Sequence, residues 1–139
     1  MQEKAKHPDF ILIDDNDIDL FLHEKIIRLQ GLSDTVLSFR SVAAALDYFA
    51  TFTHDTDSYR QTITLLDLQL PEMNGFDFLD HFNGMPATIV DNTRVFVLSS
   101  TLDHGDLSRS HAHQLVDCIL RKPLHPEALK QALSDYAFV

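Results

Sequence analysis

Four short groups of polar residues draw attention because each directly follows a run of apolar residues. Runs of this length are typical of strands buried on both faces, and parallel strands end at the same edge of their sheet. The groups are Asp14 and Asp15, then Asp67, then Ser99 and Ser100, and last Arg121, Lys122 and Pro123. If the runs are parallel strands of one sheet, these side chains converge at the edge where α/β proteins bind their ligands.

A site with three carboxylates and a lysine can bind a metal ion and a phosphoryl group together. Two carboxylates about 4 Å apart repel each other by roughly 4 kcal/mol at an effective dielectric constant of about 20, so a cation must offset the repulsion. Mg²⁺ does so with one or two carboxylates, water molecules and phosphate oxygens. Asp67 can then act as a nucleophile while Lys122 and the Ser99 hydroxyl neutralise the transferred oxygens. The groups therefore indicate phosphoryl transfer to a carboxylate.

The elements that must position these groups alternate along the chain. Apolar segments predict five strands, which cover residues 10–13, 35–39, 62–66, 95–98 and 116–120. Helical segments lie between them, and right-handed crossovers then place helices on both faces of a parallel sheet. We expect a doubly wound α/β fold with five parallel strands.

The helices are predicted from apolar spacing and from capping residues. The first is capped by Asn16 or Asp17, ends at Gly31, and is expected to bury Ile18, Phe21, Leu22, Ile26 and Leu29. The second follows Ser41 and buries Val42, Ala45, Leu46 and Phe49, and the third carries Phe76, Leu79 and Phe82 and stops near Asn83 and Gly84. A weak helix is expected at 103–113, and a last helix from Pro126 buries Ala128, Leu129, Ala132, Leu133 and Tyr136. Residues 53–61 and 85–92 are expected to be loops.

The bulk properties exclude several classes of protein. The 139 residues, 45% of them hydrophobic, suffice for one domain with its own core. No apolar run approaches the ~20 residues of a membrane span, and the first residues lack the pattern of a signal peptide. Cys118 is the single cysteine, which excludes an internal disulfide and favours the cytoplasm. The net charge of −10 argues against nucleic acid as a partner, because phosphate contacts need clustered Lys and Arg.

Four segments together carry a family resemblance. They are residues 11–15, 66–75, 97–100 and 120–124, with the sequences ILIDD, LDLQLPEMNG, VLSS and LRKPL. In order and separation they resemble the receiver domain of two-component response regulators, of the stand-alone kind. The resemblance implies a flavodoxin-like (CheY-like) sheet with strand order 2-1-3-4-5.

The resemblance also implies a role for each carboxylate at the strand ends. Asp67 accepts a phosphoryl group from a histidine kinase or a histidine phosphotransfer protein. Mg²⁺ is bound by Asp15 directly, by Asp14 through water, by Asp67, and by the backbone carbonyl of Gln69. Gln69 and Thr101 also lie near the expected path of the attacking water, where they tune the lifetime of the phosphorylated state.

Further roles follow for the residues after the fourth and fifth strands. The Ser99 hydroxyl turns towards the phosphoryl group, Lys122 pairs with that group, and the bond from Lys122 to Pro123 is cis. Ile119 stands where the family has Tyr or Phe, so Ser99 and Ile119 are the candidate switch residues. Leu70, before the loop proline, replaces the usual methionine.

These inferences lead to one leading hypothesis. Residues 1–139 form a single receiver domain without an output domain, and the protein is a cytoplasmic response regulator that signals through an unknown downstream protein. We expect a monomer or weak dimer, and not an enzyme that acts on a separate substrate. Two alternatives stay open. One is a phosphorylation-independent pseudo-receiver, which Ile119 favours, and the other is a small Mg²⁺-dependent phosphatase that uses Asp15 or Asp67.

Overall fold

The fold is a doubly wound α/β sandwich, which a computed structural model describes for residues 7–70, 73–100 and 113–136. Its sheet has five parallel strands in the order β2-β1-β3-β4-β5. The strands are β1 (Asp9–Ile13), β2 (Val36–Phe39), β3 (Thr62–Asp67), β4 (Thr93–Ser99) and β5 (Val116–Arg121). The predicted fold class, strand order and strand positions are confirmed, with differences of one or two residues at the strand ends.

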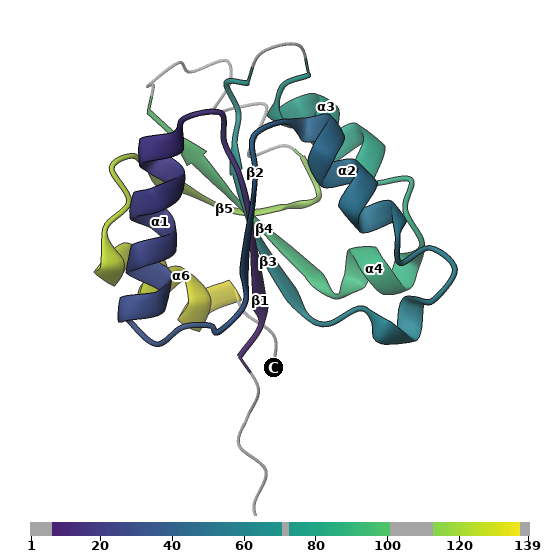
Figure 1. The fold of residues 1–139 in the computed structure, drawn as a ribbon, viewed down its shortest axis with the longest axis horizontal. Coiled ribbons are helices and arrows are strands. Elements are labelled where there is room, and N and C mark those ends of the chain that lie inside the picture. The colour runs from purple at the N-terminus through teal and green to yellow at the C-terminus, as the bar shows by residue number, and fades with distance from the viewer. Residues whose placement is uncertain (1–6, 71–72, 101–112, 137–139) are drawn as a thin grey trace, which may run out of the picture.

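The helices lie in two layers on opposite faces of the sheet, as Figure 1 shows with the sheet seen edge-on. They are α1 (Asp17–Leu29), α2 (Val42–Ala50), α3 (Gly75–Phe82), α4 (Ala87–Asp91) and α6 (Pro126–Tyr136), with a 3₁₀ turn at Thr56–Ser58. The prediction of a loop at 85–92 is wrong, because Pro86 precedes one short helical turn, α4, whose Ile89 is fully buried. The 3₁₀ turn likewise interrupts the loop expected at 53–61. The weak helix predicted at 103–113 lies, apart from His113, outside the described residues.

The predicted helix starts are explained by side-chain caps. The Asn16 side chain accepts hydrogen bonds from the backbone N–H groups of Ile18 and Asp19, and Ser41 accepts one from Ala44. Such caps satisfy backbone donors that have no partner within the helix. Gly31 follows α1 with a φ of 66°, a left-handed conformation that glycine adopts without strain.

Two hydrophobic cores lie on the two faces of the sheet. On one face, Ile11 and Ile13 of β1 pack with α2, α3 and α4 in a cluster rich in aromatic rings, which we call the aromatic core. On the other, Phe10 and Leu12 pack with α1 and α6, in what we call the aliphatic core. Neighbouring residues of β1 thus point to opposite cores, as the pleat of a strand requires.

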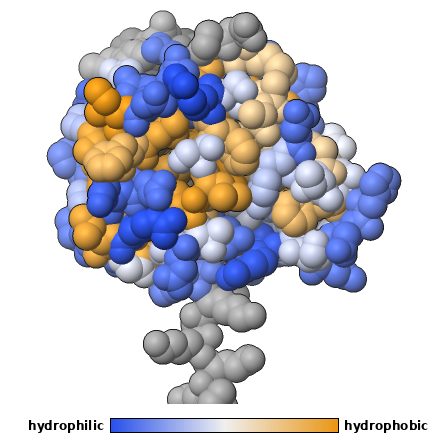
Figure 2. All heavy atoms as spheres, viewed as in Figure 1, coloured by the Kyte–Doolittle hydropathy of each residue, from blue (hydrophilic) through white to orange (hydrophobic). Residues whose placement is uncertain are grey.

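Helix α1 buries a different face from the one predicted. The residues that are buried are Leu20, His23 and Ile27. Four of the five predicted inner residues are exposed instead: Ile18 at 69%, Phe21 at 61%, Leu22 at 48% and Leu29 at 78%. The helix carries two apolar stripes, and packing against the sheet determines which of them is buried. Figure 2 shows apolar residues gathered on the side of the molecule where α1 lies.

Helix α6 follows its predicted pattern in part. Leu129 and Ala132 are buried and Leu133 is partly buried, whereas Ala128 and Tyr136 are exposed. The prediction is therefore wrong for Ala128 and Tyr136, because α6 packs in the aliphatic core through Leu129, Ala132 and Leu133. None of the helices that the structure describes is long and apolar enough to span a membrane.

Candidate functional site

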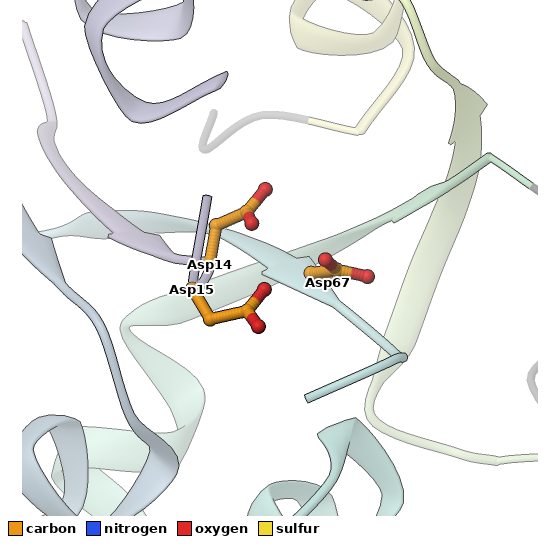
Figure 3. Close-up of side chains that lie close together, drawn as sticks. All are labelled: Asp14, Asp15 and Asp67. Atoms are coloured by element: carbon orange, nitrogen blue, oxygen red, sulfur yellow. The ribbon is translucent and has the colours of Figure 1, made fainter. Parts of the chain in front are cut away.

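Three carboxylates from two strand ends meet at the carboxyl edge of the sheet. Asp14 and Asp15 follow β1, and Asp67 ends β3, which pairs with β1 so that Ile13 lies beside Leu66. Each of the three offers an oxygen atom, and these atoms all lie within 4.8 Å of one another. Figure 3 shows the three side chains close together, with Asp67 next to Asp14 and Asp15. The structure thus brings together the carboxylates that the sequence singled out.

The ammonium group of Lys122 lies among these carboxylates. Its Nζ donates hydrogen bonds to Oδ2 of Asp14 at 2.6 Å, of Asp19 at 3.0 Å and of Asp67 at 3.2 Å. The backbone of Lys122 is held as well, because its N–H donates to the carbonyl of Ser99 at 3.0 Å. The bond from Lys122 to Pro123 is cis, as predicted. The three donors of the ammonium are therefore directed at three separate carboxylates.

Asp19 is a member of this cluster that the sequence did not reveal. It lies in the first turn of α1, where an acidic residue is equally well explained as a partner of the helix dipole. Its distance from the strand-end groups along the chain also hid it. Its position in the sequence could have indicated it, because the first turn of α1 begins at the same edge of the sheet as Asp14 and Asp15.

Burial and charge shape the protonation of the site. Burial raises the pKa of Asp67 above the usual aspartate value, although the Gln69 N–H and the Lys122 charge act in the opposite direction. Burial alone would lower the pKa of Lys122, but hydrogen bonds to Asp14 and Asp19 and the charge of Asp67 outweigh it and raise this pKa. His23, buried on α1, has a pKa lowered by burial and by the Lys122 charge. These shifts favour the positively charged form of Lys122 and the neutral form of His23.

The segment after Asp67 is closely packed. The Gln69 N–H donates to Oδ1 of Asp67 at 2.9 Å, which fixes the carboxylate. The N–H of Gly75 donates to the carbonyl of Leu68 at 3.1 Å, and a Cβ at Gly75 would lie 2.9 Å from the Asp67 carbonyl oxygen. Only glycine fits that contact without a backbone shift. The loop thereby returns to the strand end and holds Asp67 at the edge.

The candidate switch residues lie on β4 and on its neighbour β5, which is the edge strand. Ser99 is the buried last residue of β4 and pairs with Arg121 of β5. Ile119 of β5 pairs with Val97 and packs, partly buried, against the aromatic core. Thr101 lies outside the described residues.

The carboxylate cluster fits the metal that the sequence predicts. Mg²⁺ prefers oxygen ligands and is held by one or two carboxylates together with water and phosphate oxygens. Asp14, Asp15 and Asp67 supply such oxygens, and Asp15 is exposed to solvent, which leaves room for water ligands. Their mutual repulsion would be offset by a divalent ion in addition to Lys122.

Comparison with known proteins places this chain in a family. A sequence model of the response regulator receiver domain matches residues 10–134. The chain therefore belongs to the receiver domain family of two-component response regulators, whose members are phosphoacceptor signalling modules and generally bind Mg²⁺ at an acidic pocket.

Solved structures support the same assignment. The chain is 35% identical to a response regulator receiver protein from Dyadobacter fermentans, with a TM-score of 0.82 over 91% of this chain and 95% of that one. It is 29% identical to a two component response regulator from Cytophaga hutchinsonii, with a TM-score of 0.82 over 94% and 97% of the two chains. The comparison with curated proteins found no match.

Proposed function

We propose that this protein accepts a phosphoryl group on Asp67 from a histidine kinase or a histidine phosphotransfer protein, and signals through contacts with another protein. The observation that carries the proposal is the hydrogen-bonded Lys122 ammonium, which lies between Asp67 and Asp14 at the edge of the sheet. A buried lysine that holds a strand-end carboxylate is suited to neutralise a phosphoryl group bound to that carboxylate.

In the proposed transfer, a carboxylate oxygen of Asp67 attacks the phosphorus atom of a phosphohistidine, and the bond from phosphorus to the imidazole nitrogen breaks. Mg²⁺, held by Asp14, Asp15, Asp67 and the Gln69 carbonyl, would neutralise the phosphoryl oxygens. Lys122 donates to one of those oxygens, and the hydrogen bond from Gln69 orients Asp67 before the attack. Attack by water on the acyl phosphate later returns the protein to its resting state.

The signal would leave the site through β4 and β5. Ser99 reaches the phosphoryl group from the end of β4, and its backbone carbonyl accepts a hydrogen bond from the N–H of Lys122. A shift of either residue is therefore transmitted to the other and to Ile119, two residues before Arg121 on β5. Ile119 has no hydroxyl or aromatic ring, so its movement would change packing alone.

The phosphate donor must approach Asp67 closely, and α1 offers a surface for it. Beside the site lies a groove of about 280 Å³, lined by Asp19, Leu22, His23, Lys25, Ile26, Leu29, Pro123 and Leu124. Leu22 and Leu29 are exposed there, and apolar residues exposed together commonly mark a protein contact. We propose that the donor protein covers this groove during transfer.

The test is incubation with acetyl phosphate and Mg²⁺, followed by the intact mass of the protein. We expect a phosphoryl adduct that is absent from Asp67→Asn and strongly reduced in Asp15→Ala. If neither acetyl phosphate nor a kinase labels the wild type, the pseudo-receiver alternative replaces the proposal. Steady hydrolysis of a generic phosphate ester, far faster than loss of the adduct, would instead favour the phosphatase. That residues 1–139 act as a single domain, monomeric or weakly dimeric, stays a prediction.

A further inference from the structure

Asp19 is a partly buried partner of Lys122 to which the proposed transfer assigns no role. Its Oδ2 accepts a hydrogen bond from Nζ of Lys122 at 3.0 Å, shorter than the 3.2 Å bond from the same nitrogen to Asp67. The side chains are shielded from solvent, with 31% of Asp19 and 11% of Lys122 exposed. An ion pair so shielded is screened by salt far less than a surface pair.

The backbone of Asp19 is fixed independently of this ion pair. Its N–H donates to Oδ1 of Asn16 at 3.0 Å, the bond that caps α1. Asn16 in turn donates its own N–H to Oδ1 of Asp14 at 2.9 Å. Asp19 and Asp14 are thus held in register by the cap, and both direct an oxygen at the same ammonium.

This arrangement determines where the ammonium can lie. A lysine side chain has four flexible carbons, and ordering it at the moment of reaction costs conformational entropy. With Asp14 and Asp19 as anchors, two of the three ammonium donors stay satisfied while the third is directed at Asp67. Transfer of a phosphoryl group to Asp67 then changes the acceptor of one donor only, from a carboxylate oxygen to a phosphoryl oxygen.

We propose that Asp19 is a positioning residue for phosphoryl transfer, because it anchors the Lys122 ammonium beside Asp67 before the donor arrives. The inference rests on the proposed function, since it concerns the rate at which Asp67 is phosphorylated. Asp19 does not touch the transferred group, and it acts through Lys122.

The experiment compares Asp19→Asn with a matched control, Asp17→Asn. Both changes remove one negative charge from the first turn of α1, so they alter the interaction with the helix dipole equally. Asp17 pairs instead with Arg40 at 3.1 Å, and both of these side chains are largely exposed. Any difference between the variants therefore reports the contact with Lys122.

Two quantities are measured on folded protein, with urea unfolding as a check on each variant. The first is the rate of labelling by acetyl phosphate with Mg²⁺, which we expect to fall roughly tenfold in Asp19→Asn and to stay within about twofold in Asp17→Asn. The second is the proton exchange rate of the Lys122 ammonium, followed by NMR in unphosphorylated protein. It should rise severalfold in Asp19→Asn only.

The outcomes separate this inference from the proposed function. Equal behaviour of the two variants, or slower labelling of Asp19→Asn without faster ammonium exchange, overturns the positioning role. If the wild type is never labelled, the proposed function fails and the role of Asp19 in transfer fails with it. In that case the ammonium exchange alone decides whether Asp19 anchors Lys122.

Discussion

The two faces of the sheet are packed in different ways. On the aromatic side, Phe49 is fully buried and lies 4.9–6.2 Å, between ring centroids, from Tyr48, Tyr59, Phe78 and Phe82. On the aliphatic side, α1 buries only Leu20, His23 and Ile27 and exposes four large apolar residues. The face that includes α1 also supplies Asp19 to the site. The aromatic face of the sheet is thus closed by its own helices, while the α1 side leaves large apolar residues exposed, where we propose that a partner docks.

Truncation of one aromatic ring on each face should change the free energy of unfolding very differently, and this is the largest effect that we expect. We expect Phe49→Ala to lower the free energy of unfolding by about 3–5 kcal/mol, because it removes a fully buried ring from a packed core. Phe21→Ala on α1 should lower it by less than about 1 kcal/mol, since the ring is exposed and Nζ of Lys25 lies 5.5 Å from its centroid. Urea unfolding measures both, and equal losses would contradict the division of the two faces.

A charge on the exposed face of α1 should affect transfer from a protein and not from a small molecule. Leu22→Asp places a carboxylate in the groove beside the site, where desolvation by a partner is costly. We expect phosphotransfer from a phosphorylated histidine phosphotransfer protein to slow roughly tenfold, with labelling by acetyl phosphate unchanged. Leu37→Asp on β2, where Leu37 is 37% exposed, is the control. Equal slowing with both donors would show that the change at Leu22 affects the chemistry and not docking.

The smallest change in stability is expected from substitution of Asp67, which lies at the carboxyl edge of the sheet between the two helix layers. Because the folded state raises the pKa of this carboxyl, it binds a proton more tightly than the unfolded chain does. Stability from this group is therefore present at low pH and is lost as pH rises from the unfolded value of 3.8 through the folded pKa. Asp67→Asn should consequently be more stable than wild type at pH 7, and the difference should shrink towards pH 3.5. Urea unfolding at the two pH values checks the sign, and a variant less stable only at pH 7 would contradict it.

The positions of the strands and of the main site residues could be predicted because both depend on local sequence. An apolar run that ends in Asp14, Asp67 or Lys122 places that residue at the edge, whatever the details of packing. The family resemblance then supplied the strand order, which the structure confirms.

Other features depend on contacts between distant segments, and the sequence could not specify them. Which stripe of α1 faces the sheet is decided by packing against Phe10 and Leu12, and the prediction was wrong for that reason. Asp117 is a further case, because it is the extra residue at an irregularity where β5 pairs with β4. Its carboxylate accepts the N–H of Val95 at 2.9 Å in place of a strand carbonyl. Asp19 belongs to the same class, since its partner Lys122 is 103 residues away.

Phosphorylation of Asp67 can be tested by chemical trapping of the aspartyl phosphate. Protein treated with acetyl phosphate and Mg²⁺ is reduced with borohydride, which converts an aspartyl phosphate to homoserine, and the peptides are then identified by mass. We expect homoserine at position 67 and at neither Asp14 nor Asp15. Homoserine at another aspartate, or none in protein that carries the phosphoryl adduct, would contradict it.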